Sequence, residues 1–172
     1  MRLLPFLLVL FFVSCSSPRV VFDYDKKVDF TNYRSYNYYP DMETGMNQLD
    51  DKRLVRSMDS ILQERGFSRV KDPDIYINII SEEYESQNPA SIGIGLGSGG
   101  RNSGIGVSGG IPVGSVSLTQ ELVFDIIDVK RNELLWQATA KSKVSKTYTP
   151  LQREKYFRSI VEKVFNQFPP KN

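Results

Sequence analysis

The stretch VSLTQELVFDIIDV (116–129), followed by KRNE (130–133) and LLWQATAKSKV (134–144), decides the fold of this chain. Apolar residues alternate with polar ones along both long runs, a period of two that indicates strands with one buried face. KRNE predicts a hairpin turn centred on Arg131 and Asn132. The small residues Ala138 and Ala140 leave room for a helix over the buried face. We therefore expect an antiparallel hairpin with helices packed on one side.

Two segments have the period of amphipathic helices. The first covers residues 47–65, with Asn47 as N-cap and Gly66 as the residue that ends it. The second begins at Thr149-Pro150-Leu151-Gln152, a capping box with proline in the first turn, and ends at Pro169-Pro170. The two apolar stripes comprise Leu54, Val55, Met58, Ile61 and Leu62, and Phe157, Ile160, Val161, Val164 and Phe168.

Three further segments, residues 19–25, 30–39 and 74–82, are typical of strands. In the last of these, Tyr76 and Ile80 lie on the face opposite Ile75, Ile77 and Ile79, which suggests partial cover on the face of Tyr76 and Ile80. The predicted fold is α+β: a two-layer sandwich with a mainly antiparallel sheet of about five strands and two helices on one face, in the order β-β-α-β-(Gly-rich loop)-β-β-α. Residues 19–169 form a single predicted domain, and 170–172 a tail.

The Gly-rich segment 91–115 contains ten glycines. Such a stretch buries too little apolar area to offset its ordering entropy, so we expect a mobile loop between two strands. Its G-x-G-x-x-G match, residues 95–100, is not followed by a helical sequence, and we predict no nucleotide binding.

The N-terminal sequence is typical of a bacterial lipoprotein signal. An apolar run from Leu3 to Val13 follows Arg2 and is too short to span a bilayer. We expect a signal peptide over 1–14, lipid attachment at Cys15 and a short tether over 15–18. The alternatives are a plain signal peptide with Cys15 incidental, or a buried N-terminal helix. Because no acidic residue directly follows Cys15, we expect the protein on the outer membrane, facing the periplasm.

Composition excludes several function classes. The chain has 22 basic and 20 acidic residues, which offers no polybasic attraction to nucleic acid. It has no histidine, and therefore lacks the commonest general base and metal ligand, and its single cysteine allows no intrachain disulfide. We predict no catalytic residue, no metal site and no cofactor.

Tyr33, Tyr36 and Tyr38 are the only candidate ligand-binding residues. Clustered tyrosines can form a stacking platform for a small ligand or lipid, but tyrosine is also a strong strand former. The first interpretation makes the protein a periplasmic carrier, and the second makes the cluster structural.

Several motifs together resemble a known family. They are Val21-Phe-Asp-Tyr-Asp25, the run Val28 to Tyr36, Pro73-Asp-Ile-Tyr-Ile77, Asp125-Ile-Ile-Asp-Val129, and Leu134-Leu-Trp136-Gln-Ala138. Their order is similar to the bacterial lipoprotein family called domain of unknown function 4136, although Gln137 stands where that family usually has glycine. The resemblance implies a secreted, lipid-anchored α+β domain of diderm bacteria and supplies no catalytic residues.

The sequence therefore predicts a non-enzymatic envelope lipoprotein. It would be held to the membrane by acylated Cys15 and would bind an envelope protein or another envelope component. The Gly-rich loop and the exposed strand edges are the candidate contact surfaces. A small-ligand or lipid carrier is the alternative, and a carboxylate-based hydrolase is a more remote one.

Overall fold

A computed structural model describes residues 17–87 and 116–170. The predicted signal peptide, Cys15 and the Gly-rich segment 91–115 lie outside the described residues. In chain order the elements are β1 (Arg19–Tyr24), the 3-10 helix η2 (Phe30–Asn32), β2 (Ser35–Tyr38), α2 (Gln48–Glu64), β3 (Ser68–Arg69), β4 (Ile75–Gln87), β5 (Val116–Asp128), β6 (Glu133–Val144) and α3 (Pro150–Phe165).

The strands form one six-stranded sheet in the order β1-β6-β5-β4-β2-β3. β1, β6, β5 and β4 pair antiparallel, whereas β2 runs parallel to both β4 and β3. The α+β class is confirmed, but the sheet has six strands rather than about five and is mixed. Because α2 returns the chain to the end where β2 began, β3 and β4 enter the sheet parallel to β2.

The predicted strand 30–39 is correct only in its second half. Asp29 accepts hydrogen bonds from the Thr31 N–H at 3.0 Å and the Thr31 hydroxyl at 2.6 Å, and it caps η2. This local capping holds the first residues in a 3-10 turn, so that pairing with β4 begins only at Tyr36.

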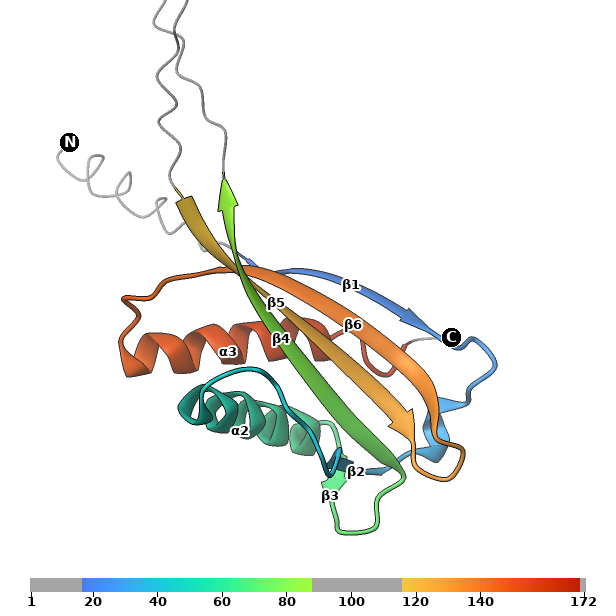
Figure 1. The fold of residues 1–172 in the computed structure, drawn as a ribbon. Coiled ribbons are helices and arrows are strands. Elements are labelled where there is room, and N and C mark those ends of the chain that lie inside the picture. The colour runs from blue at the N-terminus through green and yellow to red at the C-terminus, as the bar shows by residue number, and fades with distance from the viewer. Residues whose placement is uncertain (1–16, 88–115, 171–172) are drawn as a thin grey trace, which may run out of the picture.

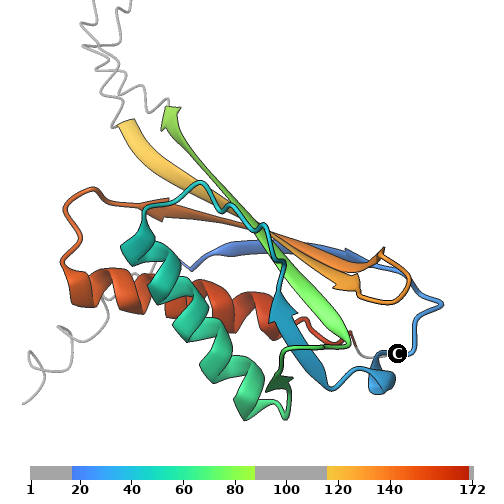
Figure 2. The ribbon, with the colours of Figure 1, turned by 60° about the horizontal axis from the view of Figure 1, so that its bottom comes forward.

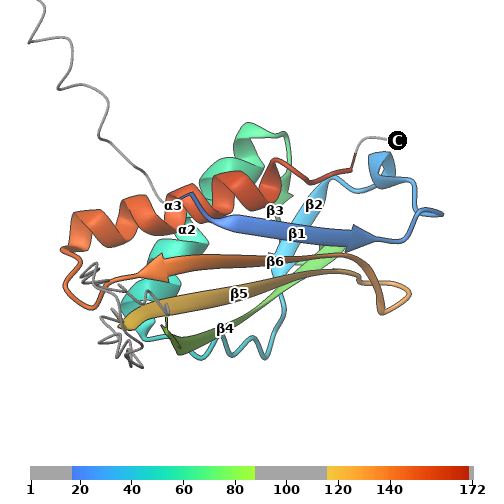
Figure 3. The ribbon, with the colours of Figure 1, turned by 90° about the horizontal axis from the view of Figure 1, so that it is seen from above.

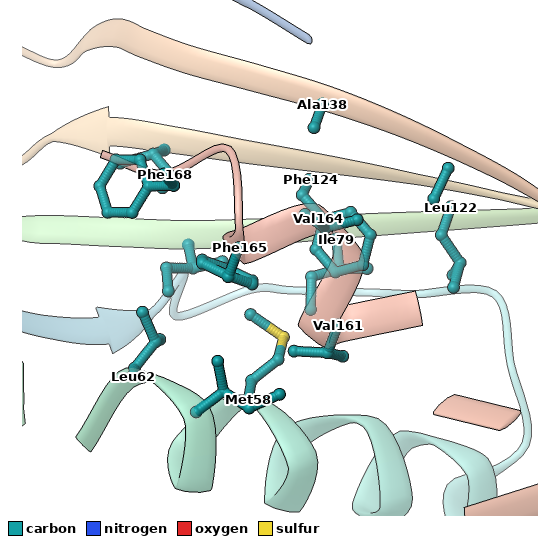
Figure 4. Close-up of a cluster of buried hydrophobic side chains, with 14 of the residues drawn as sticks. Met58, Leu62, Ile79, Leu122, Phe124, Ala138, Val161, Val164, Phe165 and Phe168 are labelled. Atoms are coloured by element: carbon teal, nitrogen blue, oxygen red, sulfur yellow. The ribbon is translucent and has the colours of Figure 1, made fainter. Parts of the chain in front are cut away.

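Both helices cover the same face of the sheet (Figures 1 and 2). Met58 and Leu62 of α2, together with Val161, Val164 and Phe165 of α3, point toward the sheet (Figure 4). The sheet contributes Ile79, Leu122, Phe124 and Ala138 to the same buried cluster. The predicted role of Ala138 and Ala140 fits this packing, because both are buried on β6, the strand that α3 contacts.

The helix ends follow the predicted capping. The Asn47 side chain accepts from the N–H groups of Leu49 and Asp50 at 3.1 Å, and Thr149 and Gln152 form a complete capping box. Gly66 follows α2 with a φ of +84°, the left-handed conformation that glycine adopts without steric cost.

The alternating pattern of β6 predicts that Leu134 shares the buried face with Trp136 and Ala138, but Leu134 is 51 % exposed. The β5–β6 register shifts between Ile126, which pairs with Trp136, and Ile127, which pairs with Leu134. The extra residue, Leu135, is buried in place of Leu134. This β-bulge moves Leu134 to the open side of the sheet.

Candidate functional site

One side of the sheet is packed against α2 and α3, and the other, which we call the outer face, is open. Figure 3 looks onto the outer face, and no helix or strand of residues 17–87 and 116–170 lies over it. Side chains directly opposite each other in an antiparallel pair share a face, so the register fixes which residues lie side by side in each row across the sheet.

The central row of the outer face is mostly apolar. It runs across β4, β5, β6 and β1 as Ile80, Val123, Thr139 and Val21. Ile80 is 44 % exposed and Val21 is 60 % exposed. An apolar row across four strands of an open sheet is typical of a contact surface.

A charged row follows on the side of the sheet where β1 begins. It consists of Glu82, Glu121, Lys141 and Arg19, with acids on β4 and β5 and bases on β6 and β1. Lys141 Nζ lies 2.9 Å from Glu121 Oε2, and this hydrogen bond raises the pKa of Lys141. Glu82 and Arg19, at the two ends of the row, form no ion pair within the described part of the chain.

On the other side of the apolar row lies a polar row, Asn78, Asp125, Gln137 and Asp23. Gln137 Nε2 donates to Asp125 Oδ1 at 2.7 Å. Beside it is an open cavity of about 490 Å³, lined by Tyr39, Asp41, Asn78, Asp125, Ile127, Asn132 and Leu134. Its lining carries two carboxylates and no basic side chain, a composition that suits a basic group flanked by apolar atoms.

The three predicted ligand-binding tyrosines lie elsewhere. Tyr36 and Tyr38 are buried, and their hydroxyls donate to the same oxygen of Asp59, at 2.8 Å and 2.9 Å. Burial, then this carboxylate, raises the pKa of Tyr36 and of Tyr38. The Arg69 guanidinium lies 4.6 Å above the Tyr38 ring and pairs with Asp59.

Tyr33 is separate from the other two. Its hydroxyl donates to Asp128 Oδ2 at 2.7 Å and accepts from Arg131 at 3.1 Å. None of the three tyrosines lines the cavity beside the polar row. A ligand would reach the rings of Tyr36 and Tyr38 only if the interface between the sheet and α2 opened. The assignment of the three tyrosines as ligand-binding residues stays a prediction.

The other acids with little exposure are bound by neighbouring groups. Asp74 accepts from the Arg34 N–H and from the N–H and hydroxyl of Ser35 at 2.7 to 3.0 Å, and these bonds lower its pKa. Burial alone would raise the pKa of Asp128, but hydrogen bonds from the Arg131 N–H, Tyr33 and the Arg131 side chain bring it below its usual value. These carboxylates hold loops and turns in place.

Two features are absent from residues 17–87 and 116–170. No three or more His, Cys, Asp or Glu side chains in this part of the chain gather closely enough to hold a metal ion. Among the same residues, neither helix combines the length and apolar character needed to cross a bilayer.

Sequence reasoning placed the contact surfaces on the Gly-rich loop and the strand edges, and missed the outer face as a whole. The signal was present in the alternation of Asn78, Ile80 and Glu82 opposite the buried isoleucines of β4. Strand pairing and register were needed to place these residues beside their neighbours on β5, β6 and β1.

Comparison with known proteins gives a family and a fold. The family model described as "Domain of unknown function (DUF4136)" matches residues 20–170. No curated protein matches the sequence. A PDZ domain protein from Parabacteroides distasonis is similar in structure, with a TM-score of 0.54 and 15 % identity, over 95 % of this chain and 39 % of that one. The chain thus spans well under half of that protein.

A second solved structure, the PelC dodecamer from Paraburkholderia phytofirmans, has a TM-score of 0.49 and 10 % identity, over 86 % of this chain and 95 % of that one. At these identities the comparison with the Parabacteroides protein shows a shared fold and nothing about activity.

Proposed function

This chain belongs to the DUF4136 family, and on that premise we propose that it is a non-enzymatic, lipid-anchored protein of the bacterial cell envelope that binds a partner protein through its outer face. The observation that carries the proposal is the contrast between the two sides of the sheet. One side is a closed core, and the other presents Val21, Ile80 and Leu134 with at least 44 % exposure each.

The membrane anchor is supported by the sequence around Cys15 and by the place where the domain begins. The signal over 1–14 is followed directly by the only cysteine, Cys15, and β1 starts four residues after it, at Arg19. A tether of this length reaches about 14 Å, so the start of β1 would lie close to the membrane. We place the protein on the outer membrane, facing the periplasm.

An anchor before β1 would determine which end of the outer face lies near the membrane and which end points away from it. Arg19 pairs with Lys141, whereas Leu134 at the cavity lies seven residues earlier on β6. Leu135 is the extra residue of the bulge, so the partners of Lys141 and Leu134 on β5, Glu121 and Ile127, are six residues apart. At about 3.3 Å per residue, the cavity would lie roughly 20 Å farther from the anchored end than Arg19. Its two carboxylates would then face the periplasm, where they suit a partner segment that carries a basic side chain.

A non-enzymatic role is supported by the structural hydrogen bonds that three carboxylates of low exposure already accept. Asp59 holds two tyrosine hydroxyls, Asp74 caps the start of β2, and Asp128 organises the β5–β6 turn. A catalytic carboxylate needs a position from which it reaches a substrate. These three face protein donors instead.

The anchor is tested by Cys15→Ser, with Ser17→Ala as the matched control. Cys15→Ser should abolish labelling by a fatty-acid probe and release the protein from the membrane fraction. Ser17→Ala should keep both properties. Separation of inner and outer membranes on a density gradient tests the location. A Cys15→Ser protein that remained membrane-bound would contradict the anchor.

The contact face is tested by a photo-crosslinking amino acid placed in cells at Leu134 or at Leu151. Both side chains are exposed, 51 % and 60 %, but Leu134 lies on the outer face and Leu151 on α3. Leu134 should give a discrete crosslinked product that weakens in the variant with Asp41→Asn and Asp125→Asn and persists with Asp72→Asn. Equal crosslinking from Leu134 and Leu151 would refute the outer face as the binding surface.

A further inference from the structure

The outer face is self-complementary. In the charged row the acids Glu82 and Glu121 occupy β4 and β5, and the bases Lys141 and Arg19 occupy β6 and β1. The two central residues of the row, Glu121 and Lys141, already pair with each other at 2.9 Å. The residues at its two ends, Glu82 and Arg19, have opposite charge and no ion-pair partner among the residues described. A surface with this arrangement attracts a copy of itself turned by 180°.

The axis of the required rotation lies between the two facing sheets. It runs parallel to the strands and passes over the space between β5 and β6. Turning one copy about this axis lays its outer face on that of the other and reverses the strand order, so that β4 faces β1. Glu82 then faces Arg19 of the second copy, and by symmetry Arg19 faces Glu82. In the neighbouring row, Ile80 faces Val21 of the second copy, so that apolar side chains meet apolar side chains.

We propose that two copies of this chain pack outer face to outer face about this axis, as two aligned sheets. Aligned sheets pack about 10 Å apart with strand directions within about 30° of each other. The inference rests on the proposed contact face and names its partner as a second copy. The interface is the apolar row, bordered on one side by the charged row and on the other by the polar row.

A second possible twofold axis runs perpendicular to the strands, along the apolar row, and fits the charges less well. Rotation about this axis would lay the charged row of one copy on the polar row of the other. Glu121 would then face Asp125, and both side chains are acidic. The same rotation would also send the two starts of β1 to opposite ends of the pair. The axis parallel to the strands keeps both starts at one end, where two acylated Cys15 residues could enter the same membrane.

The size of the contact sets the expected strength. The strands β4, β5 and β6, about 4.8 Å apart, cover the rows from Tyr76 to Tyr84 at about 3.3 Å per residue, and β1 adds the three rows from Arg19 to Asp23. The result is a patch of roughly 470 Å² on each copy. Two such patches together bury on the order of 1,000 Å², the lower limit for a specific interface. We therefore expect a reversible dimer, with the shared membrane raising its local concentration.

A charge exchange tests the pairing, with sedimentation equilibrium of the purified full chain in a density-matched non-ionic detergent. Glu82→Lys would place a cation against Arg19 of the second copy and should weaken the dimer about tenfold. Arg19→Glu should do the same. The double variant Glu82→Lys/Arg19→Glu restores opposite charges and should return the dissociation constant to within about threefold of the wild type. Asp72→Lys, an equal charge change in the β3–β4 turn, should have no effect.

Circular dichroism confirms that each variant is folded before its dimerisation is compared. A wild-type chain that stays monomeric at the highest attainable concentration overturns the inference. So does a double variant that remains as weak as the single ones, because the pairing of Glu82 with Arg19 is then wrong.

A photo-crosslinker at Ile80 in cells separates this inference from the proposed function. A product of twice the chain mass that contains only this protein supports both. A product that contains a different protein supports the contact face and overturns self-association. No product at Ile80 or at Leu134 overturns both.

Discussion

The Tyr36 hydroxyl donates to Asp59 Oδ1 at 2.8 Å and thereby joins the buried side of β2 to α2. Tyr38 donates to the same oxygen from two residues farther along the strand, and Arg69 of β3 closes the cluster at Asp59 Oδ2. Tyr36 and Tyr38 thus supply polar contacts between the sheet edge and the helix.

Asp59→Ala should destabilise the domain. It leaves the Tyr36 hydroxyl without its acceptor, leaves the Tyr38 hydroxyl only the Val55 carbonyl oxygen at 3.3 Å, and removes the ion pair of Arg69. The expected cost is about 2–4 kcal/mol in the free energy of unfolding. Urea denaturation followed by circular dichroism measures it. Glu64→Ala, an exposed acid of the same helix, should change stability by less than about 0.5 kcal/mol. Equal effects of the two substitutions would show that the Asp59 cluster contributes nothing.

Two glycines with positive φ should differ in their sensitivity to alanine. Gly66 has a φ of +84° and nothing within 4 Å of an added Cβ, so Gly66→Ala should cost only backbone strain, about 1 kcal/mol. Gly45 has a φ of +78°, and an added Cβ would lie 3.1 Å from the Ser81 carbonyl oxygen. Gly45→Ala should therefore destabilise more than Gly66→Ala in the same urea titration, and the reverse order would contradict the packing around Gly45.

Stability should fall as the pH rises above about 10. Burial raises the pKa of Tyr36, Tyr38 and Tyr156 in the folded protein, whereas the unfolded chain releases these protons near pH 10. Below that pH the three tyrosines are neutral in both states. Above it they ionise first in the unfolded state, and this ionisation stabilises the unfolded state relative to the folded one. Thermal melts between pH 9 and pH 12 should show a steady loss, and the triple variant with phenylalanine at the three positions should lose less.

Acid should destabilise the domain through Asp74 and Asp128. Hydrogen bonds lower the pKa of both carboxyl groups in the folded state, so their contribution is complete above the unfolded value, near 3.9, and is lost as the pH falls through the folded pKa. Asp128→Asn should be less stable than wild type at pH 7, and the difference should shrink below pH 4. A difference that stayed constant down to pH 2 would contradict an ionised Asp128 in the turn.

Much of the fold follows from local sequence. The hairpin of β5 and β6, the caps Asn47, Gly66 and Thr149, and the α+β class were predicted because each depends on neighbouring residues. The mixed sheet was not, since the parallel pairing of β2 with β4 joins segments that are separated by α2. The bulge at Leu135 was missed for a related reason: one inserted residue reverses the exposure of Leu134 without changing the alternating pattern around it.

The candidate site was less predictable than the fold. Val21, Ile80 and Val123 come from three strands far apart in the chain, and only the register places them in one row. The tyrosine cluster was proposed as a site because its members are close in sequence, but Tyr33 contacts Asp128, whereas Tyr36 and Tyr38 contact Asp59.

Phe168, just beyond α3, packs edge-on against Phe30 of η2 with ring centroids 5.8 Å apart. Since η2 follows the far end of β1, the last described residues lie at the opposite end of that strand from Arg19 (Figure 1). A fluorescent protein or affinity tag fused behind Asn172 would therefore lie away from the end of the domain that we propose to face the membrane, which makes this position suitable for imaging and purification in living cells.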